Sequence, residues 1–264
     1  MTDYEVIHIA VAPPANLDAN LVTSVAAVIN KGLSQTRLLL AGEVPKVIAH
    51  CDGIQAAECI IRNLRKLGLM AIACRDSELR QLPQTFNAQT LEFREKEVVF
   101  RDSAGREKMI VKDNVFLVLV GRVEACLEVE TTKQKTKFSL PRTLLMGGIP
   151  VWRTVDEKTK THSIQAESFA RLYGPKSLDP SMDILQHHMN YAFLGAKVAA
   201  SSLANFGALV QGLREVFPQA IFDDRLAKPS VLSTSSRRGW EDIEITCKLI
   251  YLFHAMTGGL NSRT

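Results

Sequence analysis

The chain has no long hydrophobic run. None of its unbroken apolar segments is longer than six residues, the length of Val115–Val120, whereas a helix that crosses a bilayer needs about 20. The acidic start Met1–Glu5 is followed at once by a strand pattern, so no secretory signal is expected. These two absences predict a cytoplasmic protein without a transmembrane segment.

Cysteine is scarce, and its spacing forms no metal-binding pattern. The five residues are Cys51, Cys59, Cys74, Cys126 and Cys247, an odd number without a C-x-x-C pair. Each lies in an apolar segment, which is typical of buried free thiols in a reducing compartment. A structural zinc site needs closely spaced Cys and His pairs. We therefore expect neither a zinc site nor another cofactor.

The sequence also lacks the short motifs of common catalytic and nucleotide-binding sites. It contains no G-x-x-x-x-G-K, G-x-G-x-x-G or G-x-S-x-G pattern, and Gly147–Pro150 reads as an ordinary turn. His50 and Cys51 are neighbours, but adjacent side chains on a strand point to opposite faces. They therefore cannot form a nucleophile and base pair.

The positive charge is concentrated in one segment. The formal net charge is +4, yet residues 1–80 are neutral, with eight basic and eight acidic side chains. Residues 131–163 hold seven basic and two acidic residues. This segment is either a weak binding site for anionic ligands or a solvated strand edge whose lysines discourage pairing. No aromatic residues interleave with Lys133, Lys135 and Lys137, which argues against stacking on single-stranded nucleic acid. The candidate anion-binding residues are Lys133, Lys135, Lys137 and Arg142.

The composition is that of a folded α+β protein. Hydrophobic residues make up 46% and charged residues 23% of the 264 residues, which excludes a disordered chain. This length favours two domains of modest size. We expect a first domain at 1–80, a linker at 81–88, a β domain at 89–229, a linker at 230–238 and a final helix at 239–257.

Residues 1–80 alternate between strand and helix periodicities. The apolar residues recur with period two in three segments and with helical spacing in three others. The extended segments are 4–12, 44–51 and 69–74, and the helical segments are 17–29, 34–40 and 54–64. Ser34 is the expected cap of the second helix. The predicted order is βααβαβ.

Five residues of this region carry a resemblance. Pro45, Val47, Ala57, Leu64 and Gly68 resemble the C-terminal domain of the ribosomal stalk protein, in which a proline-led strand precedes a helix with Ala, Leu and Gly at these spacings. The resemblance implies the same fold and a docking surface for translation factors without catalysis. The lysine-rich docking face of that family is not reproduced. The basic residues on the matching helices are Lys31, Arg37, Arg62, Arg65 and Lys66.

The third strand segment has more apolar surface than such a domain needs. Both alternating faces are apolar in Leu69–Cys74, and nearly so in Ile7–Val11. A three-stranded sheet with helices on one side needs only one apolar face. We therefore expect either the second domain or another copy of the chain to cover the other face.

The second region predicts consecutive strands closed by a helix. Strand patterns recur at 91–93, 98–100, 109–111, 115–120, 123–129 and 169–173, of which 115–120 is apolar throughout, as in a strand buried on both faces. Consecutive strands without long helices between them favour an antiparallel barrel or sandwich. Residues 203–217 have helical spacing and end before Pro218. This arrangement is similar to pleckstrin-homology-like domains, in which a helix plugs an open barrel end. The resemblance implies binding of phospholipid headgroups or peptides.

Residues 182–193 fit two structures. Asp179–Pro180 is a good helix start, but apolar residues alternate with polar ones from Leu185 to Phe193. We favour a strand, on which His187 shares the apolar face and His188 is exposed. Neighbouring histidines on a strand or a helix diverge too far to hold one metal ion together.

Adjacent carboxylates supply the candidate polar site. Asp223 and Asp224 precede Arg225 in an expected loop, and such a pair can bind a divalent cation through oxygen. Asp179, Asp183 or His188 would complete the shell. The alternative is that the carboxylates cap the backbone or pair with Arg225. The candidate metal or polar site consists of His188, Asp223, Asp224 and Arg225.

The final helix carries two apolar stripes. Burial of five large side chains is worth roughly 10 kcal/mol, at about 2 kcal/mol each, which is ample for docking on the same chain or on a second copy. A membrane surface is disfavoured because Glu241, Asp242 and Glu244 occupy the polar face. The expected interface residues are Trp240, Ile243, Leu249, Ile250 and Phe253.

The biological role cannot be read from these patterns alone. The surplus of apolar surface favours a non-catalytic interaction or regulatory protein with a protein partner, including a homo-oligomer. Two alternatives remain open. One is an enzyme with a site between the domains that uses His188, Asp223, Asp224 and Arg225, and the other is a binder of anionic ligands through residues 131–163.

Overall fold

The computed structural model describes residues 5–138, 152–228 and 240–258. The chain is a mixed α+β protein and divides into two units. One unit, called the main unit, consists of Met1–Val123 and Glu167–Thr264, and the other, called the ribbon unit, is Glu124–Ala166.

The first part of the main unit, called the N-terminal module, has the element order expected from the sequence, followed by a short extra helix. Its strands pair in the order β2-β1-β3, and both pairs are antiparallel. In chain order the elements are β1 (Val6–Val11), α1 (Ala19–Ile29), α2 (Leu33–Leu40), β2 (Lys46–Asp52), α3 (Ile54–Lys66), β3 (Ala71–Arg75) and α4 (Asp76–Arg80).

Local signals explain where the first helices begin and end. The Asp18 side chain accepts a hydrogen bond from the Leu21 amide and caps α1. Asn30 ends this helix in the left-handed region, at a φ of 53°. The expected cap of α2 is wrong, because α2 begins at Leu33 after Gly32, and Ser34 lies inside the helix.

Two further sheets follow. A five-stranded sheet has the order β11-β8-β9-β10-β4, and a three-stranded sheet has the order β5-β6-β7. The strands are β4 (Phe86–Ala88), β5 (Thr90–Phe93), β6 (Glu97–Arg101), β7 (Glu107–Val111), β8 (Leu117–Phe138), β9 (Trp152–Tyr173), β10 (Met182–Leu185) and β11 (Ile221–Leu226).

The expected antiparallel barrel is wrong for the described residues. Neither of these sheets closes on itself, and the pairs β10–β4 and β11–β8 are parallel. Parallel strands need a long connection between them. The connection from β8 to β11 includes β9, β10, the 3-10 helix η2 (Tyr191–Lys197) and α6 (Ser202–Val216), and it brings the chain to the edge of the sheet opposite β4.

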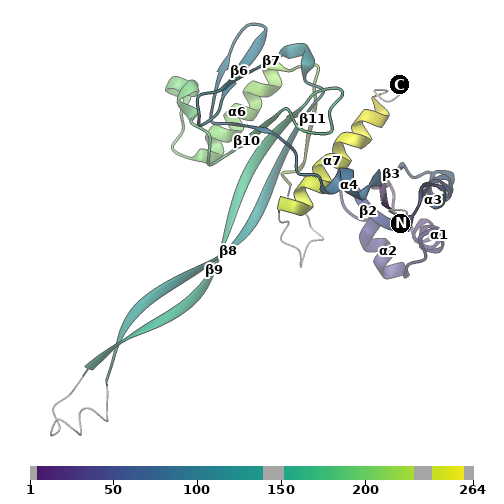
Figure 1. Ribbon diagram of the computed structural model, residues 1–264, viewed down its shortest axis with the longest axis horizontal. Helices are drawn as coiled ribbons and strands as arrows, with labels where there is room; N and C mark the ends of the chain where they lie inside the picture. The colour runs from purple at the N-terminus through teal and green to yellow at the C-terminus, as the bar shows by residue number, and fades with distance from the viewer. Residues whose placement is uncertain (1–4, 139–151, 229–239, 259–264) are drawn as a thin grey trace. The chain divides into compact units, whose positions relative to one another are not determined.

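The strands β8 and β9 are each 22 residues long and are neighbours in the sheet. Their outer parts make up the ribbon unit, which Figure 1 draws as a twisted pair of strands. The expected break between 115–120 and 123–129 is absent, and much of the basic segment 131–163 is strand. Lys133, Lys135 and Lys137 therefore belong to β8, whereas Arg142 lies outside the described residues.

The region expected to be strand at 182–193 is strand only at its start. After β10 ends at Leu185 the chain turns, and η2 begins at Tyr191. His187 is exposed in this turn and is not on an apolar face, so that prediction is wrong. His188 is exposed, as expected.

The helix α6 covers one face of the five-stranded sheet. Its buried residues Phe206, Leu209 and Leu213 form one core with the sheet and with β5, β6 and β7. A helix is thus present near the expected 203–217, but it lies on a sheet face and closes no barrel among the described residues. Within the described ranges no single helix is long and apolar enough to span a membrane, although the bent pair of η2 and α6 would pass by length and composition.

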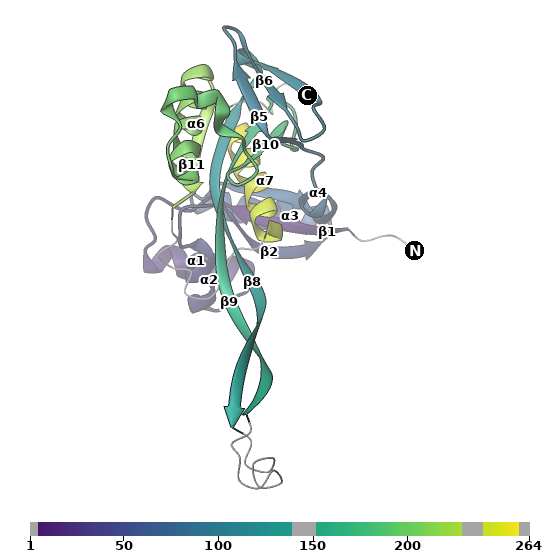
Figure 2. The ribbon, with the colours of Figure 1, turned by 90° about the vertical axis from the view of Figure 1, so that its left-hand side faces the viewer.

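The last helix, α7 (Trp240–Thr257), packs between two sheets of its own chain. Ile243, Cys247 and Ile250 join a core with the second face of the five-stranded sheet. Leu249 and Phe253 join another core with β1, β3 and α4 of the N-terminal module. Figures 1 and 2 both show α7 beside α4.

Most of the expected interface residues of α7 are buried against their own chain. Ile243, Leu249, Ile250 and Phe253 are buried, and Trp240 is partly exposed. The helix therefore packs on its own chain and also covers the second face of the N-terminal sheet. These contacts hide part of the apolar surface that favoured a partner, whereas Leu33, Leu38 and Met70 remain exposed.

Buried charges fix α7 in this place. Arg171 on β9 is 2% exposed and donates to Asp183 at 3.1 Å and to Glu244 of α7 at 2.7 Å. Lys248 is also buried, and its ammonium donates to the carbonyl oxygens of Glu78 at 2.7 Å and of Leu79 at 3.4 Å. These carbonyls end the short helix α4 and have no partners within the helix.

Candidate functional site

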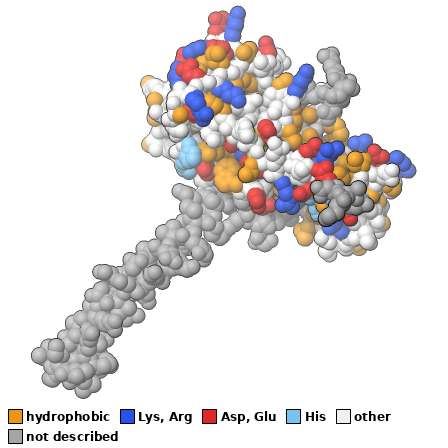
Figure 3. All heavy atoms as spheres, in the orientation of Figure 1, with side chains coloured by type: hydrophobic (Ala, Val, Ile, Leu, Met, Phe, Trp, Pro, Cys, Tyr) orange, Lys and Arg blue, Asp and Glu red, His pale blue; other side chains and the backbone are white. Residues whose placement is uncertain are grey.

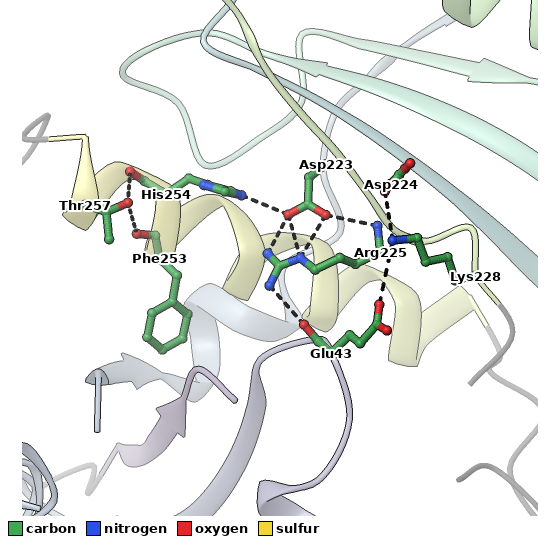
Figure 4. Close-up of polar contacts among 8 residues, drawn as sticks. All are labelled: Glu43, Asp223, Asp224, Arg225, Lys228, Phe253, His254 and Thr257. Carbon is green, nitrogen blue, oxygen red and sulfur yellow. Dashed lines mark hydrogen bonds and ion pairs between the residues drawn. The ribbon is translucent and has the colours of Figure 1, made fainter. Parts of the chain in front are cut away.

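The candidate polar site from the sequence lies where α7 passes β11. Asp223 is on a strand, not in the expected loop, and is buried. Its carboxylate accepts hydrogen bonds from His254 Nε2 at 2.8 Å and from Arg225 Nε at 3.0 Å (Figure 4). Burial alone would raise the pKa of Asp223, but these hydrogen bonds outweigh it and hold the pKa well below its usual range.

The other predicted members do not complete a metal site. Arg225 also donates to the Glu43 carbonyl at 2.9 Å, and Asp224 is exposed and lies 3.6 Å from Lys228 (Figure 4). Among the described residues no three His, Cys, Asp or Glu side chains gather so as to hold a metal ion. The structure thus shows the alternative in which Asp223 is the ion-pair partner of Arg225.

A second polar cluster was not found from the sequence. We call Asp76, His8 and His50 the histidine chain. His8 and His50 are directly opposite each other on β1 and β2, and Asp76 is the first residue of α4. The distance from His8 Nε2 to Asp76 Oδ1 is 2.6 Å, and that between the two Nδ1 atoms of the histidines is 2.8 Å. Arg80 Nε donates to the same Asp76 oxygen at 2.7 Å.

Hydrogen bonding assigns the tautomers of the histidine chain. Hydrogen bonds from Arg80 and His8 lower the pKa of Asp76, so its carboxylate is ionised and only accepts. His8 therefore carries a proton on Nε2, and the Nδ1 of a neutral His8 must accept. When His8 is neutral, His50 donates to it from Nδ1, which leaves His50 Nε2 with a lone pair.

The environment keeps His50 neutral. Burial lowers its pKa, and the nearby positive charges of Lys31 and Arg80 and the neighbouring His8 lower it further. Asp76 acts in the opposite direction but does not prevail. At neutral pH His50 is therefore an unprotonated imidazole.

The histidine chain borders a pocket of about 610 Å³. The walls come from both ends of the chain: β2 and α4 of the N-terminal module, and α7. Apolar residues line much of it, and polar groups stand among them. The apolar lining includes Leu39, Pro45, Val47, Leu79, Ile245 and Leu249, and the polar lining includes His8, Lys46, His50, Asp76, Arg80, Asp242 and Thr246.

Cys51 faces away from this pocket. Its thiol lies 3.8 Å from the Ile7 carbonyl and packs at the edge of the core between the N-terminal sheet and its helices. Burial raises the pKa of the Cys51 thiol. The prediction that His50 and Cys51 form no nucleophile and base pair agrees with this placement.

The histidine chain left no local signal in the sequence. His8 and His50 are single histidines in apolar strands, and Asp76 follows a third strand. Only the register of β1 with β2 and the start of α4 after β3 bring them together. Knowing the strand order would have revealed the pair, because cross-strand neighbours are in contact.

Comparison of this chain with protein-family models, with curated proteins and with solved structures finds no match.

Proposed function

We propose that the protein is a regulatory binding protein whose ligand is a small polar molecule held in the pocket beside His50. The observation that carries the proposal is the origin of the pocket walls, which come from β2 and α4 on one side and from α7 on the other. An apolar lining with a few converging polar groups is typical of small-molecule sites.

Ligand binding would be coupled to the docking of α7. A ligand that contacts both walls binds the docked arrangement and not a chain in which α7 has left the sheet. At a ligand concentration of 100 times Kd, such binding adds about 2.7 kcal/mol to the stability of the docked state. The ligand would therefore regulate the attachment of α7 to the N-terminal module.

The proposal can be tested by filling the pocket. Thr246 lies on α7 in the pocket lining, and Thr257 lies at the exposed end of the same helix. A library of small polar compounds is screened by thermal shift with the full chain, and the hits are retested on Thr246→Trp and Thr257→Trp. We expect Thr246→Trp to abolish the shifts and Thr257→Trp to keep them. Equal shifts in both variants would contradict the proposal.

The ribbon unit supports a second candidate, an interaction with a protein partner or with another copy of the chain. On the side of the ribbon unit, the last residue of β8 that pairs with β11 is Gly121, and the last residue of β9 that pairs with β10 is Phe169. A two-stranded ribbon is at best marginally stable by itself, and its open edges can pair with another strand. A partner that adds a strand would stabilise the ribbon unit and cover one of its open edges.

The anionic-ligand alternative also belongs to the ribbon unit, because residues 131–163 lie within it. On the face of the main unit seen in Figure 3, acidic and basic side chains are interspersed. Replacing residues 126–164 with a short turn separates the candidates. Loss of an oligomer in light scattering supports a protein contact, and loss of salt-sensitive binding to heparin supports an anion site.

A further inference from the structure

We infer that His50 Nε2 is the proton acceptor of the pocket, a general base for a ligand that carries an O–H or N–H group. The inference rests on the proposed pocket ligand for the identity of the proton donor, whereas the state of His50 can be measured without any ligand. The geometry that points to it is the histidine chain, which ends at this nitrogen.

The histidine chain is held by rigid elements. Cross-strand register places His8 opposite His50 on one side and opposite Cys74 of β3 on the other. Asp76 begins α4 two residues after Cys74, and it is fixed by Arg80 at 2.7 Å. Each side chain thus has a backbone anchor on a different element, which keeps the direction of both hydrogen bonds constant.

Charged groups reach His50 from several elements. His8 comes from β1, Asp76 and Arg80 come from α4, and Asp242 lines the pocket from α7. Lys46 is on the same strand as His50, and Lys31 follows α1. The cations oppose a second positive charge at His50, and Asp76 favours a positive charge at His8, with which it is in direct contact.

This arrangement provides a path for the proton. The O–H or N–H bond of the ligand breaks, and its proton binds His50 Nε2. The Nδ1 proton of His50 then passes to His8 Nδ1, so that His50 is neutral again and His8 is an imidazolium. The chain has gained one proton in total. The positive charge now lies on His8, whose Nε2 is 2.6 Å from the partly exposed Asp76 carboxylate.

Diethyl pyrocarbonate is a suitable probe of this nitrogen because it modifies an imidazole nitrogen that has a free lone pair. The lone pair of Nε2 attacks a carbonyl carbon, an N–C bond forms and the anhydride C–O bond breaks. The ethyl carbonate that leaves takes up the Nδ1 proton and decays to ethanol and CO2. Only an unprotonated imidazole reacts, so the rate reports the state of His50. His188 is exposed and serves as the internal reference.

The experiment uses the full chain with 15N-labelled histidine, assigned through His→Gln variants. At pH 7 we expect His50 to carry its proton on Nδ1 and His8 to carry its proton on Nε2. By mass spectrometry the ethoxyformylation of His50 should have its pH midpoint below the ordinary histidine pKa of about 6.5, in line with the direction of its pKa shift. A proton on His50 Nε2, or a cationic His50 at pH 7, would overturn the inference.

Two variants separate a relay from a merely structural contact. Asp76→Asn removes the carboxylate that receives the positive charge, and Glu58→Gln removes an exposed carboxylate of α3 that does not line the pocket. We expect Asp76→Asn to change the His8 and His50 tautomer populations and to slow the reaction of His50 at least threefold, and Glu58→Gln to leave both unchanged. Equal effects of the two variants would refute the relay. If no compound in the screen gives a thermal shift while His50 has the expected tautomer, only the proposed function is refuted.

Discussion

Replacing Lys248 with methionine tests how α7 is held to the N-terminal module. Lys248 is 2% exposed, and its ammonium donates to carbonyl oxygens at the end of α4. Methionine keeps most of the apolar stem but leaves these carbonyls without their charged donor. Burial lowers the pKa of Lys248, so the cost of desolvating its ammonium offsets part of the stabilisation from these hydrogen bonds.

The magnitude follows from the bonds that are lost. A hydrogen bond to a charged group contributes about 1.5–3 kcal/mol net, and a buried carbonyl left without a partner costs a similar amount. Because one ammonium serves several carbonyls, we expect Lys248→Met to lower the free energy of unfolding by about 2–3 kcal/mol. For a chain of this size that is a fall in Tm of roughly 4–12 °C.

The assay is guanidinium unfolding followed by circular dichroism, with Lys66→Met as the matched control. Lys66 is exposed at the end of α3, and surface substitutions of this kind usually change stability by less than about 0.5 kcal/mol. If Lys248→Met lowers the free energy of unfolding no more than Lys66→Met does, the hydrogen bonds of Lys248 do not hold α7 in place.

Two further predictions concern the five-stranded sheet. A Cβ on Gly121 would lie 2.3 Å from the Phe169 ring, so Gly121→Ala should destabilise the fold by about 1–3 kcal/mol, and unchanged thermal unfolding would contradict this packing. Asp223→Asn should cost about 1–2 kcal/mol at pH 7. Because the folded pKa of Asp223 is depressed, this cost should be full above the ordinary carboxyl pKa near 4 and shrink as the pH falls below it. A cost that stays constant down to pH 3 would contradict the ion pair.

Elements with a strong local period could be predicted from the sequence. The spacing of Ala57, Ile61 and Leu64 gives α3 one apolar side, and these three residues are buried. The order of the first six elements and the helices α6 and α7 follow from similar patterns. In each case the packing surface repeats with the period of the element itself, which sequence analysis detects directly.

The long strands and the parallel pairs could not be predicted in the same way. The segment 123–129 has a strand pattern, but the continuation of β8 and β9 through the ribbon unit depends on pairing between segments that are separate in the sequence. The pairing of β4 with β10 involves three residue pairs of segments far apart in sequence. Such pairing depends on tertiary structure and leaves no local pattern.

The candidate site was predicted only in part. Asp223 and Arg225 do interact, but with each other and with His254 and not with a metal ion. The histidine chain was missed because the contact of His8 with His50 depends on strand register. The apolar surplus was read correctly, but the element that covers it is α7 of the same chain.

Hydrogen exchange of α7 tests the central claim most directly, namely that this helix is buried between two sheets of its own chain. Exchange of amides 243–255 is followed by mass spectrometry in the full chain at protein concentrations that differ a hundredfold. We predict strong protection that is the same at both concentrations, because the buried residues of α7 pack against their own chain. Protection that weakens on dilution would show that a second copy covers the helix, and would contradict the account.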